Sequence, residues 1–439
     1  MRALFFLVLA VVLIAFGVWL AGARPQITLA KPLKTVGKAT LVEVRVSGRN
    51  GVRHFRARLE QGGRGFVAFE QWDGGPRWKV WRRRTPARAY RFVAGPQLEP
   101  GPARLVLEAQ SDDWRGSTTV SAIDFTVRTE PPPLSVDTAQ HYINQGGSEM
   151  VVFTTSADAA ESGVRLGPYQ FRSFRLPGGA PGSRFCIFAF PYDVSATATP
   201  VVYTRDDAGN ERTATFWFRV FPKKFRVRDF ELTNDFLQKV TQSIRPHTPQ
   251  MTFTGDLLAD YLKINRDLRR ENNRYLAELR SQTEERFLWS APFRQLADSK
   301  VEAQFADHRR YRYQGAQVDE QDHLGFDLAV TANVSVVASN DGKVVFAGFL
   351  GIYGNCVVID HGYALQSMYG HLSSVEVKVG DRVRQGQQIG RSGSTGLAGG
   401  DHLHFGMQVD GAQVNPAEWW DPHWIHDRLL LKFPGEKLP

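Results

Sequence analysis

Cysteine is scarce in this sequence, which has only 2 cysteines among 439 residues. So few cysteines exclude a scaffold held by several disulfides and any zinc module with four cysteine ligands. Cys186 and Cys356 fall in different predicted domains, so a disulfide between them is not expected. We expect each to pack as a small, buried apolar side chain.

Several common catalytic signatures are also missing. The chain has no P-loop, no Gly-x-Gly-x-x-Gly fingerprint and no serine-nucleophile elbow. It also lacks the His-Glu-x-x-His motif, which excludes a thermolysin-like helix with a glutamate base. The sequence therefore gives no sign of nucleotide binding or of these hydrolase machineries.

Long hydrophobic runs are absent except at the start, where residues 3–23 contain no charge. About 20 apolar residues span a bilayer, whereas the apolar region of a secretory signal is usually about 7–15 residues long. A membrane anchor over residues 1–23 is therefore favoured. The alternative is a cleaved signal peptide, because Ala21-Gly22-Ala23 has the form of a cleavage site.

Glycine and proline, by contrast, are plentiful, and the many turns they imply predict a mainly β protein. Residues 40–46 alternate as a strand does. The stiff run of three prolines at 131–133 marks the boundary between two β blocks. The turn at 206–210, followed by an alternating strand over 213–220, resembles bacterial immunoglobulin-like repeats. We predict a β-sandwich over 24–130 and an immunoglobulin-like sandwich over 131–222.

Helical spacing takes over from Asp229 to about Ser281, with Thr233 as the expected N-cap. Residues 223–290 are therefore predicted to form a helical spacer that packs on a neighbouring domain. A partner-binding or autoinhibitory helix is the alternative.

Histidine is concentrated near the end of the chain. Eight of the 11 histidines follow Pro292, in a region where strand signals return. This clustering indicates a metal site. We accordingly predict a catalytic domain over residues 291–439.

Three short fragments of this region carry the candidate ligands. His402 and His404 would point to one face of a strand, because side chains alternate along strands. His323 and Asp327 can converge across a bend at Gly325. His371 lies between these two fragments in the sequence.

Two imidazoles and one carboxylate are a standard ligand set for catalytic zinc, which lowers the pKa of a bound water to about 7. The chemistry further needs a base for that water and an acid for the leaving amine, and histidine suits both tasks. Spacing alone offers five groups and does not assign their roles: His323, Asp327, His371, His402 and His404.

The stretch from about Phe305 to Pro416 resembles the lysostaphin/LytM-type zinc metallopeptidases, which cut peptide cross-links in bacterial peptidoglycan. The resemblance rests on the five groups above and on the order of four segments between them, at residues 342–345, 353–362, 379–390 and 393–396. It implies an antiparallel β domain at the C-terminal end of the chain. It says nothing about residues 1–290.

Carried over by position, the resemblance makes His323, Asp327 and His404 the ligands of one zinc ion. It makes His371 and His402 the catalytic pair. Family members also use a tyrosine near the site, for which Tyr311 and Tyr313 are candidates, although both fit core aromatic positions as well. The remaining histidines of this region match no ligand position, and we expect structural or surface roles for His308, His361, His423 and His426.

The function implied by the resemblance is a zinc-dependent endopeptidase acting on peptidoglycan. The alternative is a non-catalytic LytM-like regulator or scaffold of cell-wall hydrolases. Residues 379–390 also resemble the hairpins of lipoyl- or biotinyl-type carrier domains. This chain lacks a lysine at a matching turn, which argues against a carrier domain. Expected partners are peptidoglycan, a membrane reached through the N-terminal helix and a regulatory protein, with no nucleic acid.

The single anchor and the lack of a wall-binding repeat favour a single-pass protein of a Gram-negative inner membrane, with its catalytic body in the periplasm or otherwise outside the cell. The net charge of +9 comes from residues 24–130, which hold 20 Lys and Arg against 10 Asp and Glu. As a hypothesis, this basic module, which includes Arg82, Arg83 and Arg84, meets lipid head groups or the wall. A solvated arginine-rich strand face is the alternative.

Overall fold

The computed structural model describes residues 22–75, 85–433 and 435, together with Leu9 and Gly17. The predicted membrane anchor therefore lies almost entirely outside the described residues, as does the run Arg82–Arg84. Within the described ranges, no helix combines the length and the apolar character needed to cross a membrane. The anchor accordingly stays a prediction.

The expectation of a mainly β protein is confirmed, and tertiary contacts divide the chain into two compact units. The first unit comprises Met1–Pro133, Asp158–Ala160 and Thr204–Arg212. The second comprises Leu134–Ala157, Glu161–Tyr203 and Thr213–Pro439. The finer division into five segments stays a prediction.

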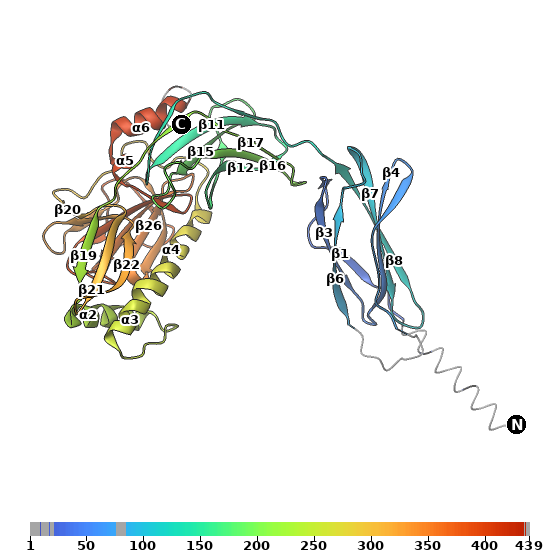
Figure 1. The fold of residues 1–439 in the computed structure, drawn as a ribbon, viewed down its shortest axis with the longest axis horizontal. Coiled ribbons are helices and arrows are strands. Elements are labelled where there is room, and N and C mark those ends of the chain that lie inside the picture. Colours follow the sequence, from blue (N-terminus) through green and yellow to red (C-terminus); the bar gives the residue numbers. More distant parts are fainter. Residues whose placement is uncertain (1–8, 10–16, 18–21, 76–84, 434, 436–439) are drawn as a thin grey trace. The chain divides into compact units, whose positions relative to one another are not determined.

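In the first unit, two sheets enclose one hydrophobic core (Figure 1). One sheet has the order β1-β3-β6 and the other the order β2-β8-β7-β4-β5. Val42, Val44 and Val46 are buried at alternate positions, as a strand with one core-facing side requires. The strands are β1 (Gln26–Leu29), β2 (Thr35–Val36), β3 (Thr40–Ser47), β4 (Val52–Gln61), β5 (Arg64–Trp72), β6 (Ala87–Ala94), β7 (Gly101–Ser111) and β8 (Thr118–Val127).

The second β block forms two four-stranded sheets, ordered β14-β15-β11-β9 and β13-β12-β16-β17, and the parallel pair β10-β18. Its strands are β9 (Leu134–Val136), β10 (His141–Asn144), β11 (Ser148–Thr155), β12 (Ala159–Leu166), β13 (Tyr169–Arg172), β14 (Phe174–Arg175), β15 (Ser183–Ala189), β16 (Val201–Asp206), β17 (Glu211–Ala214) and β18 (Phe218–Phe221). The single closing strand predicted over 213–220 is wrong. Two short strands stand there instead, because β17 belongs to the sheet of β16 and β18 pairs with β10.

A hydrophobic core within the second unit continues from this β block into the C-terminal part of the chain. The ring of Phe185 on β15 lies 5.5 Å from that of Phe433, and the ring of Phe174 lies 5.0 Å from that of Tyr363. Cys186 is buried in this core. Cys356 is buried in a neighbouring one, and both thiols are free, as expected.

The helical segment begins at α2 (Asn234–Ile244), where the hydroxyl of Thr233 accepts a hydrogen bond from the amide of Phe236, as predicted. It continues through the 3-10 helix η1 (Arg245–His247), α3 (Leu257–Lys263), the π-helical turn η2 (Ile264–Leu268), α4 (Arg269–Glu278) and the 3-10 helix η3 (Leu279–Gln282). Tyr261, Leu268 and Leu276 share a core with C-terminal residues such as Val358. The segment therefore packs on its neighbour. The helical spacing expected from Asp229 is wrong at its start, because the strand β19 (Val227–Glu231) lies there, and the role as a spacer stays a prediction.

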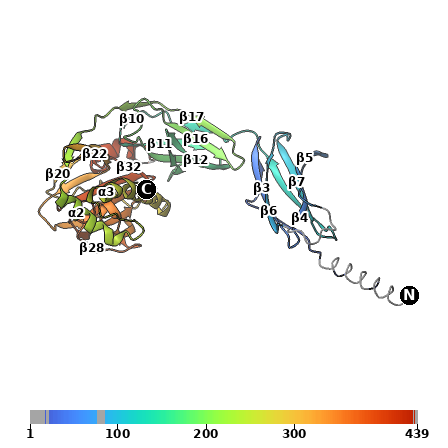
Figure 2. The same cartoon turned by 60° about the horizontal axis from the view of Figure 1, so that its bottom comes forward.

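The C-terminal part is an antiparallel β domain, as predicted, whose main sheet has the order β20-β23-β31-β27-β26-β25-β29, with β32 on β31. A second sheet, β19-β21-β22, lies beside α2 and α3 (Figures 1 and 2), and a third has the order β24-β30-β28. The strands are β19 (Val227–Glu231), β20 (Lys300–Ala303), β21 (Asp307–Tyr313), β22 (Ala316–His323), β23 (Phe326–Ala329), β24 (Ser335–Val337), β25 (Gly342–Phe349), β26 (Asn355–Asp360), β27 (Leu365–Leu372), β28 (Ser374–Val375), β29 (Arg382–Val383), β30 (Gln388–Arg391), β31 (Leu403–Val409) and β32 (Ala412–Val414). The helices here are η4 (Gly351–Tyr353), α5 (Ala417–Trp420), α6 (Pro422–Arg428) and η5 (Leu430–Lys432).

Candidate functional site

Strand register places two of the predicted ligands side by side. β23 pairs with β31 so that Asp327 lies opposite His404, and β31 pairs with β27 so that His404 also lies opposite Gly370. Directly opposed residues of antiparallel strands carry their side chains on the same face. The carboxylate of Asp327 and the imidazole of His404 are therefore neighbours through backbone pairing alone.

His323 reaches the same point across a tight bend. It is the last residue of β22, and only Leu324 and Gly325 separate it from β23. A Cβ on Gly325 would lie 2.6 Å from Nε2 of His404, so the bend requires glycine. The bend brings the side chains of His323 and Asp327 together.

The three side chains bring one donor atom each to a single point. Nε2 of His323 lies 2.9 Å from Oδ1 of Asp327 and 3.0 Å from Nδ1 of His404, and the last two atoms are 3.0 Å apart. All three residues are buried. This group could hold a metal ion.

Proton counting shows why these residues fit a cation. The N–H at Nδ1 of His323 donates to the carbonyl of Gln304 at 3.0 Å, so Nε2 of His323 offers only a lone pair. Oδ1 of Asp327 also offers only lone pairs. Nε2 of His404, on the far side of its ring, has no hydrogen-bond partner among the described residues. At most one hydrogen atom is thus available for hydrogen bonds among these three crowded nitrogen and oxygen atoms. In a tetrahedral zinc site the ligand atoms lie about 3.3 Å apart.

The surroundings keep the three candidate ligands in the protonation states that metal binding requires. Burial lowers the pKa of His323 to about 4, which keeps the ring neutral. Burial would raise the pKa of Asp327, but the charge and hydrogen bonds of the neighbouring histidines outweigh it and hold that pKa well below its usual range. Nη2 of Arg309 donates to the outer oxygen, Oδ2, of Asp327 at 2.7 Å, so Oδ1 remains turned toward the histidines.

His371 enters the site through an unusual backbone conformation. Its neighbour Gly370 already faces His404, so a regular pleat would turn the side chain of His371 to the opposite face. The φ of His371 is instead +64°, a left-handed conformation that breaks the alternation. Its ring consequently lies 4.8 Å from that of His402 and 5.8 Å from that of His404.

His371 and His402 present the same nitrogen to the site. The N–H at Nδ1 of His371 donates to the carbonyl of Thr395 at 2.8 Å, and Nδ1 of His402 donates to that of Gly400 at 2.9 Å. Nε2 of His402 lies 3.4 Å from Oδ1 of Asp327. Burial lowers the pKa of His371 well below its ordinary value, whereas the bond to Asp327 raises that of His402 despite burial. The pair thus combines a neutral imidazole with one that holds a proton more readily.

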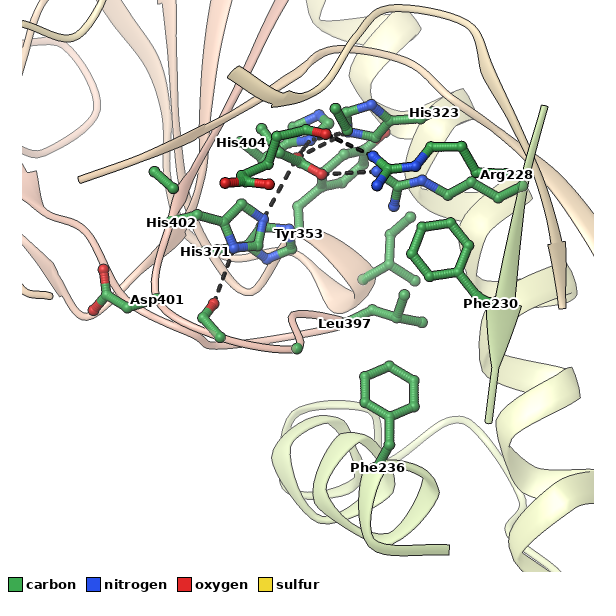
Figure 3. A pocket seen from close by; sticks show the side chains of 18 of the residues that line it. Arg228, Phe230, Phe236, His323, Tyr353, His371, Leu397, Asp401, His402 and His404 are labelled. Atoms are coloured by element: carbon green, nitrogen blue, oxygen red, sulfur yellow. Dashed lines mark hydrogen bonds and ion pairs between the residues drawn. The ribbon is translucent and has the colours of Figure 1, made fainter. Parts of the chain in front are cut away.

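A cavity of about 450 Å³ opens beside these five groups (Figure 3). Tyr353 and Leu397 line it from the C-terminal domain, and Phe230 and Phe236 line it from β19 and α2. Lys239 on α2 donates to the carbonyl of Gly399, in the loop that precedes His402. The helical segment therefore forms part of the wall of the site.

The other candidates from the sequence occupy different places. Tyr311 is buried and lines the cavity, whereas the hydroxyl of Tyr313 donates to Asn234. His361 is fully buried between the carbonyl of Asp341 and the hydroxyl of Ser367, which is a structural role. His423 and His426 are exposed, and His308 is half-buried beside Asp322.

Sequence reasoning missed Arg309, Tyr353 and the residues of the helical segment that line the cavity. Tyr353 lies with its ring 5.4 Å from that of His404, and its hydroxyl donates to Asn273. It falls in a segment already matched to the family, which was the available signal. No local pattern pointed to Arg309.

The fold and the site together define a metallopeptidase type of domain, in which an antiparallel sheet presents two histidines and an aspartate with two further histidines beside them. The family model described as Peptidase family M23 matches residues 321–416. The chain therefore carries an M23, LytM-type peptidase domain at its C-terminal end, and the resemblance found in the sequence is confirmed.

Curated relatives match over the same region. The chain is 43% identical over 94 residues to the DD-carboxypeptidase/endopeptidase Mpg of Neisseria meningitidis, covering 21% of this chain and 22% of that one. It is 44% identical over 93 residues to the peptidoglycan DD-endopeptidase ShyA of Vibrio cholerae, with the same coverages. It is 39% identical over 95 residues to the murein hydrolase activator EnvC of Escherichia coli, covering 22% and 23%. The matches thus span less than a quarter of these relatives.

Proposed function

We propose that this chain is a zinc-dependent endopeptidase that cleaves peptide cross-links of bacterial peptidoglycan. The observation that carries the proposal is the convergence of three donor atoms within 3.0 Å of one another, beside His371 and His402. Relatives named for DD-endopeptidase activity support it, because they match the region that contains the site.

His323, Asp327 and His404 would hold one zinc ion. Bound there, zinc supplies a Lewis acid for the scissile carbonyl and a water whose pKa is near 7. Asp327 contributes the negative charge of the ligand set, and Arg309 holds its outer oxygen in place.

The remaining two histidines handle the proton and the developing charge. Because both Nδ1–H groups are engaged with backbone carbonyls, Nε2 of His371 and Nε2 of His402 are the atoms that act. They orient the attacking water, accept its proton and donate to the oxygen that becomes negative in the tetrahedral intermediate.

The test measures bound metal and cleavage on the same preparations. We expect the purified chain to hold zinc and to release new amine termini from purified peptidoglycan, and His404→Ala to lose both. His426→Ala, which removes an exposed histidine outside the site, is the matched control. A folded, zinc-loaded full-length chain that releases no new amine termini from peptidoglycan would contradict the proposal.

The alternative is a non-catalytic regulator of cell-wall hydrolases. The specific observation in its favour is the relative named murein hydrolase activator, which matches the same domain. The intact set of five groups argues for catalysis. A regulator would raise the activity of an added cell-wall hydrolase, and His404→Ala would remain as effective as the wild type.

We also propose that residues 1–23 anchor the chain in the inner membrane and that the catalytic body lies in the periplasm. The support is the uncharged run over residues 3–23. Cell fractionation checks this: the full chain should stay with the membrane after a high-salt wash, and a chain that starts at Arg24 behind an exported signal should be released.

A further inference from the structure

Two arginines outside the M23-matched range border the catalytic cavity. Arg228 lies on β19 and Arg269 is the first residue of α4, and both line the cavity that contains His402 and His404. Figure 3 shows Arg228 and Phe230 reaching from β19 toward this cavity. Neither position belongs to residues 321–416, so the family match assigns them nothing.

Arg228 and Arg309 both approach the ring of Phe230. The guanidinium carbon of Arg228 is 5.7 Å from the centre of the Phe230 ring, and that of Arg309 is 5.3 Å from the same ring. Arg309 in turn donates to the ligand Asp327. One N–H of Arg228 donates to the carbonyl oxygen of Glu302. Most of the five N–H donors of its guanidinium therefore remain for another acceptor.

Arg269 approaches the cavity from the helical side. Two of its donors, Nε and Nη2, hold the backbone carbonyl and side chain of Asn265 one turn earlier, which fixes the guanidinium. Its charge opposes the burial that raises the pKa of Tyr353 to about 12, and the ring of Tyr353 lies 5.4 Å from that of His404. Arg269 therefore forms part of the wall of the same cavity, close enough to Tyr353 for its charge to affect that hydroxyl.

The carboxylates around the cavity are engaged elsewhere. Glu302 pairs with Lys300 at 2.8 Å, although it also feels the charge of Arg228. Asp401 accepts hydrogen bonds from the hydroxyl of Ser392 and the amide of Asn333. Among the described residues, no carboxylate lies within ion-pair distance of the two arginines Arg228 and Arg269.

We infer that Arg228 and Arg269 form a carboxylate-binding subsite beside the metal centre, and that the substrate is a peptide with a free carboxylate close to the scissile amide. This rests on the proposed endopeptidase function. A planar guanidinium matches a carboxylate with two parallel hydrogen bonds, so such a subsite distinguishes a free acid from its amide.

The test uses the zinc-loaded full chain and two synthetic cross-link fragments. In one, the residue on the amine side of the scissile bond carries a free carboxylate, and in the other that group is a carboxamide. The readout is the ratio of the two kcat/KM values, because a merely structural defect would lower both. We expect the wild type to prefer the acid by about 10- to 100-fold, the range expected for charged hydrogen bonds.

Arg228→Gln and Arg269→Gln should each reduce this ratio by about tenfold, with zinc content unchanged. The matched control is Arg270→Gln, which changes the next residue of α4, an exposed side chain paired with Asp267. A wild type that cleaves both fragments equally, or a ratio unmoved in both variants, overturns the subsite and leaves the endopeptidase standing.

If neither fragment is cleaved, the proposed function fails and calorimetric binding of the same two fragments decides the inference. Tighter binding of the acid that is lost in Arg228→Gln supports the subsite. Equal binding of acid and amide overturns it.

Discussion

Two buried clusters of the second unit each combine histidine with a carboxylate. They differ in how a positively charged side chain meets that carboxylate. The lysine cluster consists of His141, Glu149 and Lys432, whose ammonium nitrogen lies 2.6 Å from Oε1 of Glu149. Burial would raise the pKa of Glu149, but the neighbouring His141 and the hydrogen bond and charge of Lys432 lower it overall. This cluster carries its own cation and ties β10 and β11 to the end of the chain.

The site cluster consists of His323, Asp327 and His404. Here the nearest arginine, Arg309, contacts the outer oxygen of the aspartate, and the inner oxygen faces two imidazoles. The comparison teaches that a buried histidine–carboxylate group by itself is a poor sign of a metal site. The informative feature is an inner oxygen turned toward imidazole nitrogens and away from the side-chain cation.

The largest expected effect separates the two clusters by their carboxylates. Asp327→Ala should weaken zinc binding by more than about 100-fold, because changes to outer-shell partners alone already cost about 10- to 100-fold. Glu149→Gln should leave the zinc stoichiometry of the folded chain unchanged. Metal analysis after dialysis against a weak chelator measures both, and retention of zinc by Asp327→Ala would remove the distinction.

The next effect divides binding from chemistry inside the site. His402→Ala should lower cleavage of peptidoglycan by about 10²- to 10⁴-fold, the usual contribution of a general acid–base group, while zinc is retained. His371→Ala should behave in the same way. Loss of zinc from either variant would make that histidine a ligand and shift the boundary of the site cluster.

The third effect tests the lysine cluster as a structural ion pair. Lys432→Met should destabilise the second unit by about 3–5 kcal/mol, because it leaves the carboxylate of Glu149 buried without its cation. Urea unfolding measures the change, and zinc content of the folded fraction should stay constant. Lys300→Met, which removes an exposed partner of Glu302, should leave the midpoint nearly unchanged.

The smallest effect concerns Glu418, which accepts hydrogen bonds from Asn144 and from the amide of Ser148. Burial raises the pKa of Glu418 from 4.5 to about 7. The folded chain therefore binds this proton more tightly than the unfolded chain. The contribution of Glu418 to stability is thus fully present below pH 4.5 and is lost as the pH rises to about 7. We expect a loss of about 1–3 kcal/mol across that window.

Unfolding midpoints at several pH values, compared between the wild type and Glu418→Gln, check this expectation. The variant should lose the part of the pH dependence that lies between 4.5 and about 7. A slope unchanged in Glu418→Gln would assign the dependence to another group.

Much of the candidate site could be predicted because its residues are linked by short spacings. His402 and His404 are two residues apart, and His323 and Asp327 are four apart across a bend that needs Gly325. Such spacings determine which side chains share a face. The pairing of Asp327 with His404 then follows from the order of the strands.

The fold was harder to predict where consecutive residues of one segment belong to different sheets. Alternation over residues 213–220 is compatible with one strand, yet the structure uses the segment in two sheets, through β17 and β18. Arg309, Arg310 and Arg312 are equally basic neighbours on β21, and only the packing of that strand gives Arg309 to Asp327. A local pattern contains no information about which distant surface a face will meet.

The sequence by itself determined the mainly β character, because strand alternation and turns act over a few residues. The resemblance of its motifs identified the M23-type domain, and the sequence also singled out five candidate site residues. Only the tertiary structure decided that Arg228, Phe236 and Arg269 border the cavity and that Arg309 supports Asp327. It also decided that Lys432 supplies the charge of the second cluster, 283 residues from Glu149. The physical reason is that burial and charge pairing depend on which surfaces meet in space. These contacts join segments that are far apart along the chain, and a local sequence pattern does not show which distant segments will meet.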